Sequence, residues 1–277
     1  MSRTLFGGFH YSIVTTLDTT SSISRFAMEI CQRGQAWVEK DGDLEFDFTK
    51  LILRSLDDEY FFATTKDRVG ESTSVDLDRL VKTRIPSDNI WPRYSIDFLR
   101  APDPLPLDCY VKEPNLLDYG DTLASTQMSY QIIHEIQICE ILRLHPHPNI
   151  STYKGCVVRS GRIRGLCFSR YKMTLAQRLS EAQGLDKHLC YQRIEKGIHH
   201  LHSLGLVHND VNPTNIMLDE KDNPCIIDFD SCQFQGQKLG LKGGTRGWTM
   251  EGEAYASLEN DFFGLARLRE LMGLSSE

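Results

Sequence analysis

The chain has no apolar run that approaches the roughly 20 residues needed to cross a bilayer. Its first residues, Met1 to Gly7, hold one Arg and no long apolar stretch, unlike a secretory signal. There are no internal repeats, and no C-x-x-C pair occurs among the eight cysteines. Scattered thiols inside apolar stretches, such as Cys139 and Cys167, are typical of buried free cysteines in a reducing compartment. We therefore expect an intracellular, cytoplasmic protein without a membrane segment.

Positive charge is also scarce. The 31 Lys and Arg residues are outnumbered by 38 Asp and Glu residues, which gives a formal net charge of −7. A nucleic-acid-binding surface needs a face dense in Lys and Arg, so we expect no nucleic-acid partner. Hydrophobic residues make up 40% of the chain and charged residues 25%, values close to those of globular proteins. A packed core is therefore expected.

Patterns typical of strands and of helices both occur along the chain. Residues 37–48 alternate around Asp41-Gly42 and predict a hairpin, whereas the proline-rich residues 85–108 predict an extended linker or irregular strand region. Apolar spacing predicts helices over 125–144, 189–204 and about 260–272, and short strands over 109–112, 150–158, 163–168, 206–208, 216–218 and 225–227. We interpret residues 1–95 as a mixed α/β region of unknown role and residues 96–277 as a second domain.

The strongest chemical signal lies between His208 and Asp228. Asp210 is followed by Asn215, and Asp228 comes directly after a short apolar strand. Phosphoryl-transfer sites are built in this order: the first Asp faces the nucleophile, and the Asn and second Asp hold a divalent metal against a nucleoside triphosphate. The structural alternative is an Asx-type turn at Asp210 and Asn215, with Asp228 capping the end of a strand.

From about Val111 onward, the order of these motifs resembles the protein kinase family. The resemblance implies an α+β, two-lobed fold. Its small β-rich lobe would extend to about residue 170, and its mainly helical large lobe, over about 171–277, would be truncated relative to the family. The resemblance also implies ATP and Mg²⁺ as cofactors, and a protein substrate or protein partner.

On this resemblance, the nucleotide contacts begin with Lys112, the strand lysine that reaches the α/β-phosphates. Glu135 is its helix partner, since such a Lys needs a nearby carboxylate to stay charged and aimed, and Glu140 is the alternative. Phe168 to Tyr171 corresponds to the hinge whose backbone would hold an adenine. The structural alternative is that Lys112 and Glu135 are solvated surface residues and that the hinge is a plain strand-to-loop join.

The same resemblance assigns roles in the large lobe. Asp210 is the catalytic base, and Asn212 stands where serine/threonine kinases carry a Lys that neutralises the transferred phosphoryl group. Asn215 and Asp228 are the metal ligands, offering the hard oxygen atoms that suit magnesium. Asp261 corresponds to the Asp that ties down the backbone of the catalytic loop, which is a structural role.

Several features depart from the family pattern. No G-x-G-x-x-G stretch precedes Lys112. Asn209 replaces the Arg of H-R-D, so control through a phosphate on the activation segment is not expected. Asp230 replaces the Gly of D-F-G and adds a negative charge beside the metal site. Residues 242–248 resemble the end of an activation segment. The apolar helix 261–272 lacks the helices that normally cover it, so residues 1–95, a second protomer in a dimer or a partner protein would have to do so.

Three functions are therefore open. The first is a protein kinase-like enzyme, of serine/threonine type if active, that moves the γ-phosphate of ATP to a protein hydroxyl. The second is a pseudokinase that acts as a binding or scaffold module, favoured by the missing Gly-rich loop and by Asn212. The third is a small-molecule kinase, which shares the Asp…Asn…Asp site and tolerates the loss of the catalytic-loop Lys.

Overall fold

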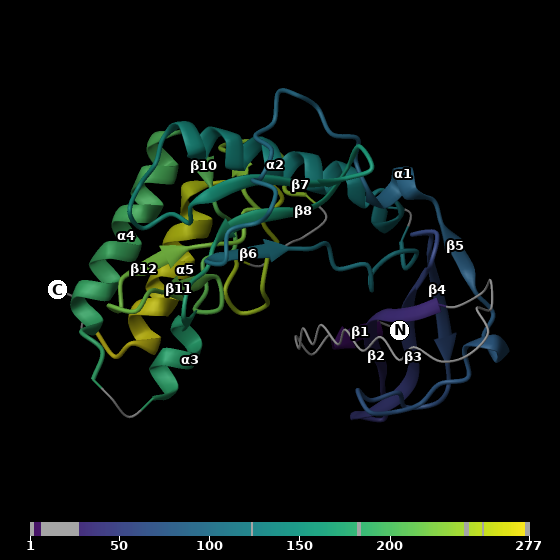
Figure 1. Ribbon diagram of the computed structural model, residues 1–277. Helices are drawn as coiled ribbons and strands as arrows, with labels where there is room; N and C mark the ends of the chain where they lie inside the picture. The colour runs from purple at the N-terminus through teal and green to yellow at the C-terminus, as the bar shows by residue number, and fades with distance from the viewer. Residues whose placement is uncertain are drawn as a thin grey trace. The chain divides into compact units, whose positions relative to one another are not determined.

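The structure is a computed structural model that describes residues 3–6, 28–122, 124–181, 184–240, 244–250 and 252–274. It forms two compact units (Figure 1). Unit 1 comprises residues 1–91 and 114–129, and unit 2 comprises residues 92–113 and 130–277. The chain therefore enters unit 2, returns to unit 1 for one short segment, and then completes unit 2. Each unit is described by itself below.

Unit 1 contains a five-stranded antiparallel sheet in simple sequence order. Its strands are β1 (Arg3–Phe6), β2 (Met28–Lys40), β3 (Asp43–Ser55), β4 (Tyr60–Thr65) and β5 (Thr83–Ile85). The predicted hairpin joins β2 to β3 through Asp41 and Gly42, which both have positive φ angles, as a tight hairpin turn requires. The middle of β3 is fully buried at Leu51, Ile52 and Leu53.

The second segment of unit 1 packs on this sheet through a buried lysine. The Lys50 ammonium donates to the carbonyl of Tyr119 at 2.7 Å and pairs with the Asp121 carboxylate at 2.6 Å. Leu116 and Leu117 join the apolar cluster that includes Ile52. A 3₁₀ turn at Leu77–Arg79 and the short helix α1 (Ser87–Ile90) complete the unit.

Unit 2 begins with a three-stranded sheet in the order β6–β8–β7. These strands are β6 (Cys109–Lys112), β7 (Tyr153–Arg159) and β8 (Arg162–Ser169), close to their predicted bounds. The predicted linker is not a free tether, because residues 99–101 hydrogen-bond along β7: Cys156 N–H donates to Leu99, and Ala101 N–H to Cys156. A Cβ at Gly155 would lie 2.5 Å from the backbone nitrogen of Ala101, so this close approach needs glycine.

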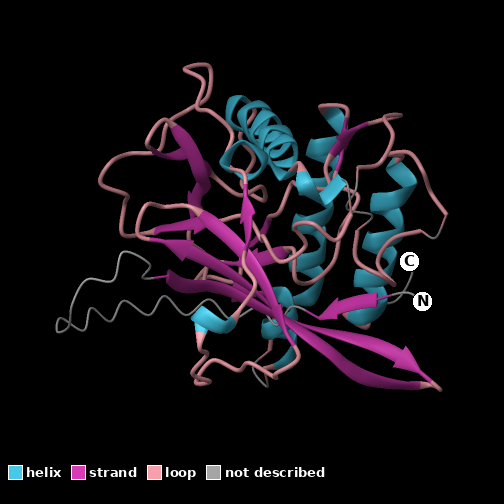
Figure 2. Ribbon diagram, turned by 90° about the vertical axis from the view of Figure 1, so that its right-hand side faces the viewer, coloured by secondary structure: helices cyan, strands magenta, loops and turns pink. Residues whose placement is uncertain are grey.

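The remainder of unit 2 is mainly helical. Its helices are α2 (Met128–Leu144), which belongs to unit 2 from Tyr130 onward, α3 (Leu175–Ser180), α4 (Lys187–Ser203) and α5 (Leu258–Leu271). Short strands lie between them: β9 (Met173–Thr174), β10 (Leu206–Val207), β11 (Ile216–Leu218), β12 (Pro224–Ile226) and β13 (Gln233–Phe234). The order β12–β11–β9 forms one small sheet, and β10 pairs with β13. Figure 2 distinguishes the helices, in cyan, from the strands, in magenta.

One apolar core runs through unit 2 and includes the inner face of α5. Leu265, Leu268 and Met272 are buried in this core, and α5 contacts α4. These side chains therefore need no cover from a second protomer or partner, contrary to the expectation from the sequence, although Phe262 and Leu271 are exposed. Among the described residues, no helix is both long enough and apolar enough to cross a membrane.

Candidate functional site

Lys112, at the end of β6, lies among carboxylates from two other parts of unit 2. Its ammonium donates to Glu135 of α2 at 2.6 Å and to Asp228, in the loop after β12, at 2.7 Å. Glu135 is 5% exposed, because α2 turns this face toward the core. The structure therefore brings together three of the residues that the sequence selects. Glu140 lies elsewhere, where it accepts from Leu99 N–H and pairs with Arg143.

The electrostatics of this cluster follow from burial and from the balance of charges. Burial alone would lower the pKa of Lys112, but the nearby carboxylates of Asp228, Glu135 and Asp230 outweigh it and hold that pKa well above its usual value. Burial raises the pKa of Glu135, Lys112 opposes this shift, and the two aspartates add to it. Lys112 therefore stays charged, and its carboxylate neighbours compete for it.

Asp210 follows β10, and donors from two segments of the chain hold its carboxylate. Asn212 Nδ2 donates to Oδ1 at 3.0 Å, and Asn215 Nδ2 donates to Oδ2 at 2.9 Å. From residues 244–250, the backbone N–H of Thr245 donates to Oδ1 at 2.8 Å, and the Thr245 hydroxyl lies 3.2 Å from Oδ2. The Asp210 carboxylate is thus fixed in orientation.

Asn212 also organises the turn between Asp210 and Asn215. Its Oδ1 accepts from the backbone N–H of Thr214 at 2.8 Å and from that of Asn215 at 3.2 Å. These are the local bonds of an Asx-type turn, so the structural alternative for these residues is present in the loop. It coexists with the contacts to Asp210, because Asn212 uses its oxygen for the turn and its nitrogen for the carboxylate.

The loop after β12 is tied to the loop before Asp210. Asp228 has a positive φ of 65°, and the next residue, Phe229, is fully buried against the ring of His208. The His208 ring nitrogen Nε2 donates to the carbonyl of Ile227 at 3.0 Å. A buried ring and one hydrogen bond therefore hold the Asp228 loop in register with the Asp210 loop.

Asp261, near the start of α5, holds the backbone of the loop that leads to Asp210. Its carboxylate is fully buried and accepts the backbone N–H groups of His208 at 2.9 Å and Asn209 at 2.8 Å. The ring nitrogen Nε2 of His202, on α4, lies 2.8 Å from the same carboxylate. This geometry agrees with the structural role expected of Asp261.

Comparison with known proteins finds a family model that overlaps most of this site. The family model described as "Protein kinase domain" matches residues 121–250, a range that contains Glu135, Asp210, Asn215 and Asp228 but begins after Lys112. Residues 121–250 are therefore similar to a protein kinase domain, and the relatives described next include kinases. The matched range corresponds to part of the kinase domain.

Individual relatives agree on the kinase class but differ in their acceptors. The chain is similar to "MAP kinase kinase kinase win1" of Schizosaccharomyces pombe, at 27% identity over 43% of this chain and 9% of the relative. It is similar to "Probable CTD kinase subunit alpha homolog" of Encephalitozoon cuniculi, at 32% identity over 39% of this chain and 32% of the relative. It is also similar to "3-deoxy-D-manno-octulosonic acid kinase" of Vibrio parahaemolyticus, at 47% identity over 16% of this chain and 19% of the relative. The chain thus spans about a third or less of these relatives.

The hinge residues predicted for this kinase-like chain lie in and after β8. Phe168 pairs with Tyr110 of β6, and its ring packs against Tyr153 with the centroids 5.6 Å apart. The Tyr171 hydroxyl accepts the backbone N–H of Thr152 at 3.3 Å. Phe168 is 7% exposed, so an adenine would have to be recognised by the backbone here rather than by this ring.

The residues that could hold a metal are Asp228 and Asn215. In the described ranges, no three His, Cys, Asp or Glu side chains are arranged to hold a metal ion. Mg²⁺ does not need such a set, because it is usually bound by one or two carboxylates together with substrate phosphates and water. One carboxylate and one amide oxygen donor therefore fit magnesium that arrives with a nucleotide.

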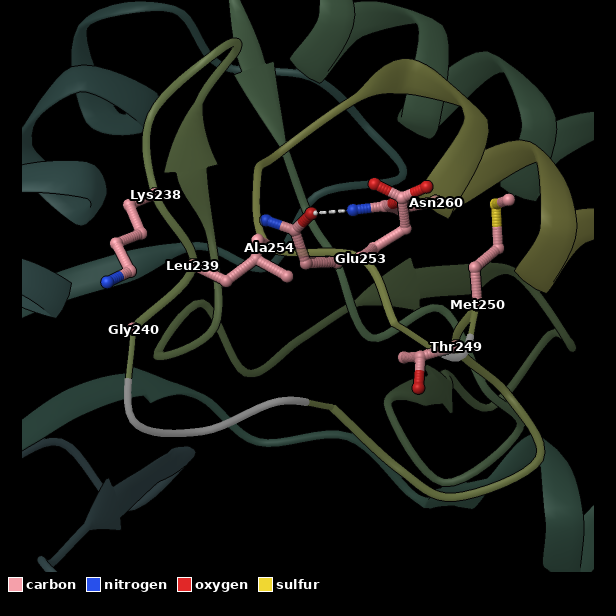
Figure 3. Close-up of a pocket in the computed structure, with 9 residues that line it drawn as sticks. Lys238, Leu239, Gly240, Thr249, Met250, Glu253, Ala254 and Asn260 are labelled. Atoms are coloured by element: carbon pink, nitrogen blue, oxygen red, sulfur yellow. Dashed lines mark hydrogen bonds between the residues drawn. The ribbon is translucent and has the colours of Figure 1, made fainter.

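A separate cavity of about 240 Å³ lies in unit 2, beside Asn209 of the loop that leads to Asp210 (Figure 3). Lys238, Thr249 and Glu253 line it, and so do Asn209 and Asn260, which are joined by a side-chain hydrogen bond. Lys112, Asp210 and Asp228 are not among its lining residues. The cavity is therefore distinct from the predicted nucleotide site.

Sequence reasoning missed two features of the site. The sequence indicates Thr245 only as part of the segment 242–248, of which residues 242 and 243 lie outside the described residues, and does not predict its contact with Asp210. From the sequence, Asn209 indicates only the loss of an arginine, whereas its buried side chain makes three hydrogen bonds. The dipeptide Gly244-Thr245 was the available signal for the first feature. No local pattern pointed to the second.

Proposed function

We propose that this kinase-like chain transfers the γ-phosphoryl group of ATP to a protein hydroxyl, with serine or threonine as the acceptor residue. The observation that carries the proposal is the convergence of Lys112, Glu135 and Asp228 within hydrogen-bond distance, from a strand, a helix and a loop. In phosphoryl transfer the protein mainly positions the reactants and stabilises charge. A cation on β6 next to a carboxylate that can ligate metal supplies both functions.

In this proposal, Asp210 orients the acceptor hydroxyl and takes its proton as the hydroxyl oxygen bonds to the γ-phosphorus. The bond from that phosphorus to the leaving oxygen of ADP breaks in the same step. Bound magnesium, held by Asn215 and Asp228, would neutralise phosphate charge. The hydrogen bonds from Asn212, Asn215 and Thr245 support this role, because they fix both oxygens of the Asp210 carboxylate. General-base catalysis of this kind contributes about 10²–10⁴ in rate.

The proposal includes a two-lobed organisation of residues 96–277. The strands β6, β7 and β8 fall before residue 170, and α3, α4 and α5 fall after it, which supports a small β-rich lobe and a mainly helical large lobe. Phe168 and Tyr171 would then lie at the hinge, where the backbone holds the adenine. Residues 1–95 would be a separate region, and a protein substrate or partner is the proposed binding partner.

Slow turnover is part of this proposal. Asn212 offers hydrogen bonds where a Lys would neutralise the transferred group, and no Gly-rich loop precedes Lys112. A small-molecule kinase is the second candidate, favoured by the similarity to a sugar-acid kinase over a short segment. The segment 242–248 favours a protein acceptor, because its sequence resembles the end of a protein-kinase activation segment.

Nucleotide binding is the first test. A thermal melt would compare the protein with and without ATP and MgCl₂, alongside Asp228→Ala. A ligand present at about 100 times its dissociation constant stabilises the fold by about 2.7 kcal/mol, so a metal-dependent rise in Tm should appear and be lost in the variant. The absence of any rise in Tm at millimolar ATP would instead favour a pseudokinase that acts as a binding module.

Transfer is the second test. Asp210→Asn should abolish phosphoryl transfer from labelled ATP to a protein acceptor while leaving the nucleotide-dependent rise in Tm intact. Equal transfer by the variant and the wild type would contradict the role of Asp210. Transfer to a sugar acid but not to any protein would favour the second candidate.

A further inference from the structure

Lys112 is surrounded by more negative charge than its partnership with Glu135 requires. A third carboxylate, that of Asp230, lies 3.7 Å from the Lys112 ammonium, in addition to Glu135 at 2.6 Å and Asp228 at 2.7 Å. One positive and three negative charges give this cluster a formal sum of −2. Asp230 is largely buried, with its side chain 13% exposed, so water screens its charge only in part.

The backbone explains why both aspartates reach the same cation. Phe229, between them, is fully buried and packs edge-on against the ring of His208, 5.8 Å away. With Phe229 anchored in the core, Asp228 and Asp230 on either side of it both approach Lys112. The Ser231 hydroxyl donates to Asp230 Oδ1 at 3.3 Å and helps to fix the carboxylate. Asp230 is therefore held in place at the cluster.

This charge balance has a consequence for nucleotide phosphates. A triphosphate carries several negative charges and needs Lys112, because no Gly-rich loop precedes this residue and no Lys stands at position 212. Without metal, the triphosphate must displace carboxylates from Lys112 and enter a site that is already negative. With a divalent cation bound to the phosphates, the incoming charge is reduced, and Asp228 gains a partner other than Lys112.

We propose that Asp230 competes with the nucleotide phosphates for Lys112 and thereby makes nucleotide binding depend on a divalent cation. Asp230 is in this view a specificity-determining residue that rejects metal-free nucleotide. The inference rests on the proposed function, since it assumes that Lys112 contacts phosphate. It adds a role for a residue that is outside the proposed catalytic and metal-binding set.

The test is the affinity for ATP, measured by calorimetry once in EDTA and once in excess MgCl₂. Asp230→Asn and Asp230→Gly should bind metal-free ATP at least about tenfold more tightly than the wild type does, and should change much less in MgCl₂. The ratio of the two affinities should therefore shrink. Asp97→Asn is the matched control, because it removes one carboxylate at an exposed position of unit 2 and should leave the ratio unchanged. Thermal melts without ligand confirm that each variant is folded.

The possible outcomes separate the inference from the proposed function. If the wild type binds ATP in MgCl₂ and Asp230→Asn shows the same metal dependence, the inference is wrong and the proposed function stands. If the Asp230 variants lose binding in MgCl₂ and gain none in EDTA, Asp230 supports metal binding rather than opposing phosphate, which also overturns the inference. If neither wild type nor variants bind ATP under either condition, the proposed function fails, and the inference fails with it.

Discussion

Asn260 Nδ2 donates to Asn209 Oδ1 at 2.9 Å, and both side chains are buried, at 5% and 4% exposure. The bond joins the start of α5 to the residue before Asp210. Asn209 Nδ2 donates in turn to the carbonyls of Val207 and Ser231, each at 3.0 Å. The Asn209 side chain therefore links the strand β10, the loop after Asp228 and the start of α5.

Replacing Asn209 by Ala should destabilise the protein. The change leaves the carbonyls of Val207 and Ser231 and the amide of Asn260 buried without these partners, and a buried unsatisfied polar group costs about 1–3 kcal/mol. We expect the free energy of unfolding, measured by urea denaturation, to fall by at least about 2 kcal/mol. Asn260→Ala should also destabilise the protein, because it removes the bond to Asn209 together with the bonds to the Tyr255 carbonyl and the Ser257 hydroxyl. Additive effects in the double variant would contradict a direct coupling between the two amides.

Thr245→Val should slow phosphoryl transfer without weakening nucleotide binding. The change removes the hydroxyl that lies 3.2 Å from Asp210 Oδ2 and accepts from Asn212 Nδ2 at 3.2 Å, but keeps the size and β-branching of the side chain. Loss of a hydrogen bond to a charged group costs about 1.5–3 kcal/mol, so the rate should fall about tenfold or more. Thr245→Ser keeps the hydroxyl and should retain most of the rate. If Thr245→Val changed only the affinity for ATP and not the rate of transfer, the proposed action of Thr245 on Asp210 would be contradicted.

Much of the fold of unit 2 could be predicted from the sequence. The helices α2, α4 and α5 follow from apolar residues at helical spacing, and β7, β8, β11 and β12 from short apolar runs between turn residues. These patterns are local, so they can be recognised in the sequence without knowledge of the tertiary structure. The order of motifs also predicts the pairing of Lys112 with Glu135. The sequence alone does not exclude the alternative that both residues are solvated at the surface.

The features that could not be predicted depend on contacts between distant segments. Nothing local to residues 99–101 indicates that they bond to β7, since the requirement for Gly155 is visible only when the two backbones meet. From the sequence alone, the inner face of α5 is expected to need an outside partner, because the sequence does not show that Leu265 and Leu268 join the same apolar core as α4. The third carboxylate at Lys112 likewise depends on how Phe229 is buried.

Gly264→Ala should destabilise unit 2 and disturb the catalytic loop. A Cβ at position 264 of α5 would lie 2.6 Å from the carbonyl oxygen of Val211 and 2.7 Å from its Cβ. Overpacking of this kind costs about 1–3 kcal/mol, which exceeds the gain of about 1 kcal/mol in helix propensity from Gly to Ala. Urea denaturation should show the loss of stability. Because Val211 directly follows Asp210, transfer should also slow.

Gly184→Ala is the matched control for this change. An added Cβ at Gly184 meets nothing within 4 Å, and its φ is not positive. The same substitution there should be neutral or stabilise the protein by about 0.4–1 kcal/mol, through the reduced entropy of the unfolded chain. If Gly264→Ala behaved like Gly184→Ala, the close packing of α5 on Val211 would be contradicted.

His147 should make the stability of the protein sensitive to mild acid. Its ring stacks on that of His200 with the centroids 4.8 Å apart. Burial lowers the pKa of His147 below its usual value, and His200 and Lys196 lower it further. A His with a depressed pKa takes up its proton more readily in the unfolded chain, so stability is present above the unfolded value of about 6.5 and is lost as the pH falls below it.

Unfolding by urea between about pH 8 and pH 5 measures this effect. The free energy of unfolding should fall with pH below about 6.5, and His147→Gln should flatten that fall, because the titrating group is gone. His200→Gln should flatten it less, since it removes one source of the shift but leaves the burial of His147. His188→Gln is the control, because no pKa shift of His147 is attributed to it. A fall in stability that is identical in the wild type and in His147→Gln would assign the pH dependence to other groups, because the protonation of His147 would then contribute nothing to it.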